Sequence, residues 1–224
     1  MAEHPVVLLR LWEDISSFGG ILGGLLGIWL FLRLKSPAVA ASTRLVYFDA
    51  VAFVFPFALA VGRVACSLAH DHPGTVTSFP LAISLESPKA QAYITGVYQA
   101  SGRLGELPPP AVLAQLGFHD LGWYELLYLG LVVLPTFALL GRRGRPAGFF
   151  VLAFIIMYMP VRFALDFLRV ADARYLGLTP AQYVASAMLL SIPLVSRSRA
   201  RRPAAPIIAP SREPRVRGSS GGAS

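Results

Sequence analysis

Five long apolar segments constrain this chain more than any other feature of its sequence. Crossing roughly 30 Å of hydrocarbon takes about 20 mostly apolar residues, and each segment comes close to that length. Because backbone polar groups inside a membrane must be hydrogen-bonded within the segment, we interpret all five as helices. The sequence therefore predicts an all-α polytopic membrane helix bundle. Its expected spans are Ile15–Leu34, Leu45–Cys66, Gly122–Gly141, Ala147–Leu168 and Thr179–Val195.

The low charge content agrees with a membrane protein. Apolar residues make up 55% of the chain and charged residues only 14%, whereas about 25% is usual for a soluble domain. The single cysteine excludes a disulfide scaffold. Seven of the twenty basic residues lie in the last 28 positions, so the net charge of +8 does not indicate a nucleic-acid partner. We expect a transmembrane domain over residues 1–195 and a basic, flexible tail over residues 196–224.

The arginines and lysines between the spans predict the orientation, because positive loops stay on the inner face. One set of connections, including the tail, holds thirteen of them and the opposite set five. The C-terminus is therefore expected in the cytoplasm, and five spans then place the N-terminus outside. Residues 1–14 lack the pattern of a signal peptide, from which we expect that one or more upstream spans are missing.

One connection, from Ser67 to Leu121, is much longer than the others. It lies on the outer side and is rich in proline, with few strong periodic runs. The sequence predicts a folded-over outer loop there rather than a domain.

Two arginines, Arg63 and Arg162, fall within or at the edge of the predicted spans. An ionisable side chain at such depth costs about 2.5–3.5 kcal/mol, so it marks a candidate functional site. Helical spacing puts Asp166 one turn and Arg169 two turns beyond Arg162, on one face. Two interpretations stay open: an internal Arg162–Asp166 pair that holds helices together, or a phosphate clamp for an anionic lipid, because guanidinium groups match phosphate oxygens.

Other residue patterns give weaker signals. Gly19, Gly23 and Gly27 form a small-residue ridge typical of close helix packing. His70, Asp71 and His72 are disfavoured as a metal site, because three adjacent loop residues do not easily reach one ion. We interpret Cys66 as a small apolar filler. His119 is either an interfacial anchor or a proton carrier.

Five motifs in this order resemble the prolipoprotein diacylglyceryl transferase family. They are SFGG at the start of a span, GR-x-x-C-x-x-x-x-D-x-x-G at the end of the next, H-x-x-x-x-YE, RF-x-x-DF-x-R and GLTPAQ, and they cover Ser17 to Ser186. The resemblance implies a multi-pass enzyme of the bacterial inner membrane. Such enzymes move the diacylglyceryl group of phosphatidylglycerol to the lipobox cysteine of a preprolipoprotein and release glycerol phosphate. The implied partners are phosphatidylglycerol, the preprolipoprotein signal peptide and membrane lipid.

The resemblance also implies the site residues. Arg63 matches an arginine implicated in headgroup binding, Arg162 matches a second essential arginine, and Asp166 replaces the usual glutamate of that helix. Asp71, Gly74, Arg169, His119, Tyr124 and Glu125 match further family positions. The family's SFHGG histidine has no counterpart in Ser17 to Gly20, nor do its first spans and a functional tyrosine.

If the chain is an enzyme of this kind, positioned cations must stabilise the departing phosphate. We expect Arg63 and Arg162 to hold it, with Asp166 orienting Arg162. Thiol activation needs a base that is neutral near pH 7, for which we consider His119 or His70. The displacement implies no metal and no organic cofactor. The alternatives are a lipid-binding paralogue without turnover and, with less support, a small-solute transporter.

Overall fold

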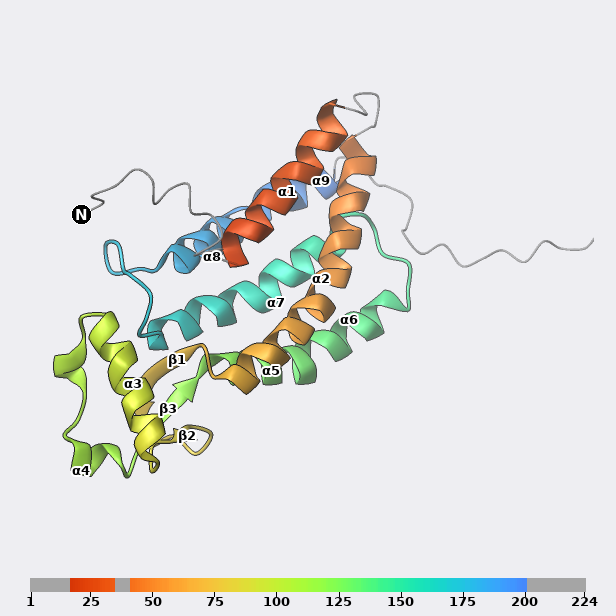
Figure 1. Ribbon diagram of the computed structural model, residues 1–224. Coiled ribbons are helices and arrows are strands. Elements are labelled where there is room, and N and C mark those ends of the chain that lie inside the picture. The colour runs from red at the N-terminus through yellow and green to blue at the C-terminus, as the bar shows by residue number, and fades with distance from the viewer. Residues whose placement is uncertain (1–16, 35–40, 201–224) are drawn as a thin grey trace, which may run out of the picture.

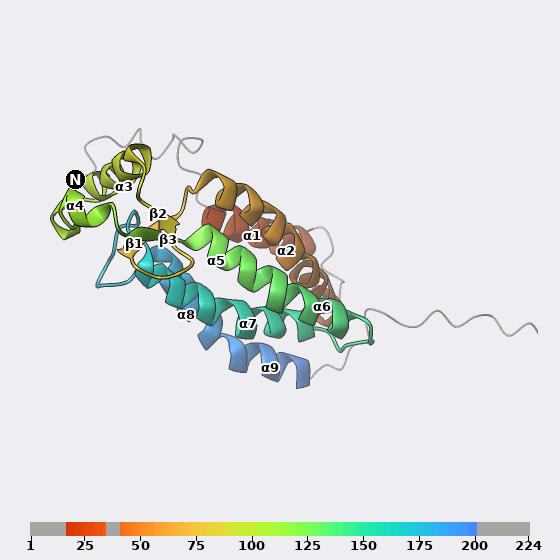
Figure 2. The same ribbon diagram turned by 90° about the horizontal axis from the view of Figure 1, so that it is seen from below.

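The computed structural model of the protein describes residues 17–34 and 41–200. It is mostly helical, with a bundle of long helices and a smaller head at one end (Figures 1 and 2). The expected missing N-terminus and most of the expected tail lie outside the described residues. In chain order the elements are α1 (Ser17–Leu34), α2 (Ala41–Ala69), β1 (Pro73–Thr77), β2 (Ile83–Ser84), α3 (Pro88–Ala100), η2 (Leu104–Glu106), α4 (Pro110–Leu113), β3 (Gly117–Asp120), α5 (Leu121–Tyr128), η3 (Leu129–Val133), α6 (Leu134–Gly141), α7 (Phe149–Leu165), η4 (Asp166–Leu168), α8 (Pro180–Leu190) and α9 (Ile192–Ala200).

Three helical stretches in the described part are long and apolar enough to cross a membrane. They are Arg44–Ala69, Leu121–Gly141 and Phe149–Leu168, which confirms the second, third and fourth predicted spans as such helices. In the third, η3 is a wider π-helical turn between α5 and α6. It immediately precedes the turn of Pro135, which has no N–H to donate to the preceding turn.

The first and fifth predicted spans are helical as well, but the fifth is not one helix. It divides into α8, of 11 residues, and α9, of 9 residues. The break lies at Ser191, whose hydroxyl donates to the Met188 carbonyl at 2.6 Å. Pro193 follows, and its ring removes a backbone donor from the next turn. A count of five membrane spans therefore stays a prediction.

The glycines of α1 do not pack as the small-residue ridge suggested. A Cβ atom added at Gly23, Gly24 or Gly27 would meet nothing within 4 Å among the described residues. Gly19 lies outside the residues whose side-chain surroundings are described, so the result applies to the second half of the ridge alone.

The connection predicted to be a folded-over outer loop rather than a domain is instead a small folded head with a sheet and a core of its own, so that expectation was wrong. Its three short strands form an antiparallel sheet in the order β1-β3-β2. The predicted all-α fold class therefore holds only for the bundle. The head has a hydrophobic core of its own, because apolar residues spread over many short elements converge on one point. That core comprises Leu85, Ile94, Tyr98, Leu113, Phe118 and Val170.

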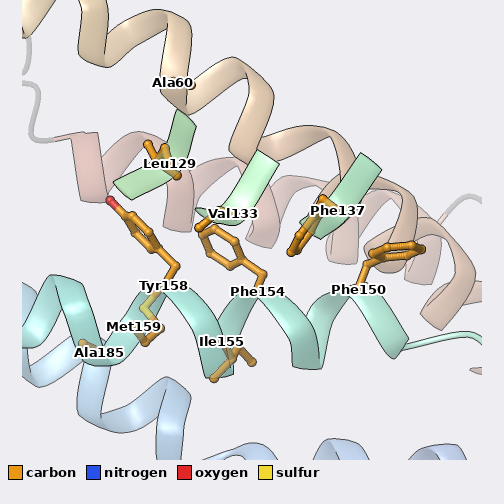
Figure 3. Close-up of a cluster of buried hydrophobic side chains, with 10 residues drawn as sticks. All are labelled: Ala60, Leu129, Val133, Phe137, Phe150, Phe154, Ile155, Tyr158, Met159 and Ala185. Atoms are coloured by element: carbon orange, nitrogen blue, oxygen red, sulfur yellow. The ribbon is translucent and has the colours of Figure 1, made fainter. Parts of the chain in front are cut away.

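The bundle core lies between α2, α7 and the α5–α6 helix. Figure 3 shows Phe150, Phe154 and Tyr158 in a row along α7, with the Tyr158 hydroxyl pointing away from the phenylalanines. Helix α2 also holds the start of α7, because buried Asp49 accepts a hydrogen bond from the Val151 N–H at 2.9 Å. A carboxylate at a helix N-terminus satisfies free N–H groups and favours the helix dipole. These contacts fix α7, and with it Arg162, against α2.

Candidate active site

The two buried arginines of the bundle share one carboxylate. Arg63 comes from α2, Arg162 from α7, and Glu125 from α5 reaches both. Arg63 Nε pairs with Glu125 Oε2, and Arg162 Nη1 lies 3.1 Å from Glu125 Oε1. The exposed fractions are 8% for Arg63, 3% for Arg162 and 1% for Glu125. The sequence did not predict which residue joins the two arginines, and in the structure Glu125 does so.

Arg162 has a second carboxylate partner on its own helix. Its Nη1 lies 2.7 Å from Asp166 Oδ1, which confirms the pair predicted from the helical spacing. Asp166 Oδ2 accepts the hydroxyl hydrogen of Thr179 at the start of α8. Thr179 and Gln182 form a reciprocal capping box, and the Gln182 amide also donates to the Phe163 carbonyl at 3.1 Å. Buried polar groups from α7 and α8 therefore hold Arg162 in one position.

Glu125 is held by charge more than by hydrogen bonds. Both of its oxygens are buried and neither makes a well-aligned hydrogen bond, although each contacts a guanidinium group. A buried carboxylate without aligned donors is a costly arrangement. Two guanidinium groups therefore share the single negative charge of Glu125, and a second anion can compete with it for them.

An apolar cavity of about 460 Å³ opens from this cluster. It follows α2 from Leu45 to Cys66, a length of about 30 Å at 1.5 Å per residue. Arg63, Cys66, Tyr158 and Arg162 lie on its wall, and the rest of the lining is mostly apolar. Among those lining residues are Phe55, Leu59, Phe154, Ile155, Met159 and Met188. Such a cavity accepts long hydrocarbon chains and places two fixed cations beside them.

Arg169 and Asp71, both expected to bind substrate, lie beyond Arg63 on the head side. Arg169 follows η4, makes an isolated β-bridge with Gly74, and pairs with Asp172 at 3.2 Å. Asp71 Oδ1 lies 2.5 Å from His72 Nδ1. The pKa of the His72 imidazole is lowered, first by burial and then by the nearby charges of Arg169 and Arg63. An imidazole in this place is neutral at physiological pH.

His119 and Tyr124 contact each other rather than the arginines. His119 Nδ1 lies 3.0 Å from the Tyr124 hydroxyl, and both rings pack with Phe79 of the head. Burial lowers the pKa of His119. Of the expected H-x-x-x-x-YE block, only Glu125 has ion pairs with the arginines.

Gly74 allows β1 to approach two other segments closely. A Cβ atom there would lie 2.9 Å from the His119 Cβ and 3.0 Å from the Leu168 carbonyl oxygen. The glycine thus lets the chain before Arg169 pack on the sheet.

We expect Gly74→Ala to lower the free energy of unfolding by about 1–3 kcal/mol, the usual cost of overpacking. The thermal unfolding midpoint in detergent measures this. Gly96→Ala in α3 is the matched control, because a Cβ there meets nothing within 4 Å and alanine favours a helix. An equal midpoint for both variants would contradict the close approach.

One group of three side chains in the described part has the composition of a metal site. The candidate ligand atoms of Cys66, Asp71 and His72 all lie within 4.8 Å of one another. The expectation that adjacent loop residues do not reach one ion left out Cys66, which comes from α2. Arg63 Nη1 lies 3.7 Å from the Cys66 sulfur, and a guanidinium this close repels a metal cation.

Sequence reasoning missed the connection of Glu125 to both arginines, and it missed Tyr158, Thr179 and His72 as parts of the site. Tyr158 lies beside Arg63 on the cavity wall. Thr179 belongs to the GLTPAQ motif, and its T-x-x-Q pattern is a sequence signal for a capping box.

Comparison with known proteins points to one family. A family model described as prolipoprotein diacylglyceryl transferase matches residues 1–197. Three curated relatives are named phosphatidylglycerol–prolipoprotein diacylglyceryl transferase. The protein of Chromohalobacter salexigens is 28% identical over 87% of this chain and 61% of its own length. That of Citrobacter koseri is 29% identical over 86% and 64%, and that of Xanthomonas oryzae pv. oryzae 31% identical over 86% and 62%. The chain thus spans between 61% and 64% of the length of these relatives.

Proposed function

Because the chain belongs to the prolipoprotein diacylglyceryl transferase family, we propose that it transfers the diacylglyceryl group of phosphatidylglycerol to the lipobox cysteine of a preprolipoprotein. The observation that carries the proposal is the pair of buried arginines joined by Glu125 at the wall of an apolar cavity. The cavity takes the acyl chains, and the guanidinium groups take the phosphate.

Arg63 and Arg162 hold the phosphate of the lipid headgroup. Asp166, fixed by Thr179, orients Arg162, while Glu125 keeps the two cations together before the lipid enters. Arg169 and Asp71 lie on the side from which the headgroup and the peptide approach. Gly74 sets the position of the Arg169 segment, and Tyr124, with His119, lines the outer approach in the head.

The reaction is a displacement at the glyceryl carbon that bears the phosphate. The thiol loses its proton, the thiolate attacks this carbon, a C–S bond forms, and the C–O bond to phosphate breaks. Negative charge moves onto the departing phosphate oxygen, where fixed guanidinium groups stabilise it in a site with little water. Glycerol phosphate leaves, and the diacylglyceryl group stays on the peptide.

The proposal includes a topology. Five spans in the inner membrane, with the C-terminal arginines in the cytoplasm, place the head and the arginine cluster toward the outer leaflet. The alternating arginine counts of the connections support this orientation. A cysteine-accessibility scan of residues in the head and the tail measures it.

A reconstituted assay tests the function. The purified chain in phosphatidylglycerol vesicles, given a lipobox peptide, is expected to increase the peptide mass by one diacylglyceryl group. Phosphatidylcholine vesicles are the control, because their headgroup is zwitterionic. Lipid binding without any modified peptide would support the paralogue without turnover, and absence of both would refute the proposal.

A further inference from the structure

The turn after α2 brings His72 back to the last turns of that helix. His70 adopts a positive φ of 51°, which is uncommon for a residue with a side chain. Its ring pairs with Asp120 at 2.6 Å, and its carbonyl accepts the Tyr93 hydroxyl hydrogen at 2.6 Å. The surrounding head therefore holds a backbone conformation of a kind that clusters at functional sites. Through this reversal a ring nitrogen of His72 comes within 4.8 Å of the Cys66 sulfur.

The charges around His72 define its protonation and its orientation. Asp71 Oδ1 lies 2.5 Å from Nδ1, although the two are not aligned as a hydrogen bond. Because a carboxylate only accepts, this contact favours the tautomer with the hydrogen on Nδ1 and a lone pair on Nε2. Burial lowers the pKa of the imidazole most, Arg169 from the segment after η4 and Arg63 from α2 lower it further, and Asp71 opposes them. A neutral histidine with an oriented lone pair can accept a proton.

Cys66 marks a position where a thiol lies close to the phosphate clamp. Its sulfur lies 3.7 Å from Arg63 Nη1 and on the wall of the apolar cavity. A substrate thiol that attacks a glyceryl carbon next to a bound phosphate must come equally close to Arg63. The same position therefore lies near both the leaving group and His72.

We propose that His72, oriented by Asp71, is the base that takes the proton of the acceptor thiol, and that this thiol binds beside Cys66. The proposal rests on the diacylglyceryl transfer proposed above. The S–H proton goes to Nε2, the thiolate forms the C–S bond, and the glycerol phosphate leaves with the C–O electron pair. The imidazolium then returns its proton to water.

A selenocysteine peptide separates this role from a structural one, because a selenol is far more acidic than a thiol and needs no base at neutral pH. We expect His72→Gln to lower kcat for the cysteine peptide about 100-fold or more. The KM for phosphatidylglycerol should not change, and the selenocysteine peptide should restore most of the rate. In the wild-type protein the cysteine rate should rise with pH through a pKa below the usual value of histidine, and His72→Gln should remove that dependence.

His119→Gln is the matched control, because His119 contacts Tyr124 rather than the arginines. It should keep the wild-type ratio of selenocysteine to cysteine rates. The His119→Gln variant also tests the alternative that His119 is the base. A ratio raised in His119→Gln and not in His72→Gln would overturn the proposal, as would equal losses with both peptides in His72→Gln.

Alkylation of Cys66 tests the position of the base without any transfer reaction. Cys66 is the single cysteine of the chain, so iodoacetamide reports on it alone. We expect His72→Gln to slow its alkylation at pH 7, and His119→Gln, whose ring contacts Tyr124, to leave it unchanged. If the wild-type protein modifies neither peptide, the transfer function fails. If transfer occurs but Cys66 of His72→Gln is alkylated at the wild-type rate, only the assignment of His72 as the base is refuted.

Discussion

Arg63→Ala should reduce diacylglyceryl transfer about 100- to 1000-fold, the usual loss when one preorganised donor to a developing charge is removed. Arg63 is 8% exposed and contacts Glu125 Oε2 from α2, whereas Arg162 contacts Oε1 from α7. Without it the phosphate keeps one guanidinium group, and Glu125 then pairs with Arg162 alone. The mass shift of a lipobox peptide in phosphatidylglycerol vesicles, measured at saturating lipid, gives the rate.

Arg63→Lys separates charge from geometry. Lysine keeps one positive charge but not the planar donors that match two phosphate oxygens, so an intermediate rate is expected. Lys89→Ala removes an exposed cation at the start of α3 and should leave transfer unchanged. If Arg63→Ala transfers at the wild-type rate while its protein level holds, Arg63 does not bind the leaving phosphate.

Much of the bundle could be predicted from the sequence, because membrane helices need long continuous apolar runs. The spans over α2, α5–α6 and α7 follow directly from this requirement. The break between α8 and α9 was not predicted, because a proline such as Pro193 also occurs inside membrane helices that stay continuous. The head escaped prediction for a different reason. Its strands have two to five residues each, too few to show the alternation that identifies a strand.

The arginines of the site were predictable and their partner was not. Arg63 and Arg162 stand out because a charge inside an apolar run is costly. The Arg162–Asp166 pair follows from helical spacing, and the structure confirms it. Glu125 reaches them from a third helix, and no local pattern reports a contact between residues so far apart in sequence. The approach of His72 to Cys66 depends on one backbone reversal at His70, which sequence spacing does not reveal.

Glu125→Gln should lower the free energy of unfolding by about 3–5 kcal/mol, because it leaves buried guanidinium groups without their shared counter-charge. Glu125 is 1% exposed and touches both Arg63 and Arg162. Glu106→Gln is the matched control: it makes the same substitution in an ion pair with Arg103 at 2.6 Å, but on the surface. Its unfolding free energy should stay close to the wild-type value, since exposed pairs contribute little.

The same variant links stability to the lipid site. In Glu125→Gln the two guanidinium groups lose the carboxylate that they share, although Arg162 keeps Asp166, and the phosphate of a lipid in the cavity can take the place of that carboxylate. Added phosphatidylglycerol should therefore raise the thermal midpoint of Glu125→Gln in detergent by more than it raises that of the wild-type protein, and phosphatidylcholine should raise neither by as much. An anion that fills the place of the Glu125 carboxylate must stabilise the Glu125→Gln variant more than the wild-type protein. Equal midpoint shifts with phosphatidylglycerol and phosphatidylcholine would therefore show that the arginines do not bind the headgroup.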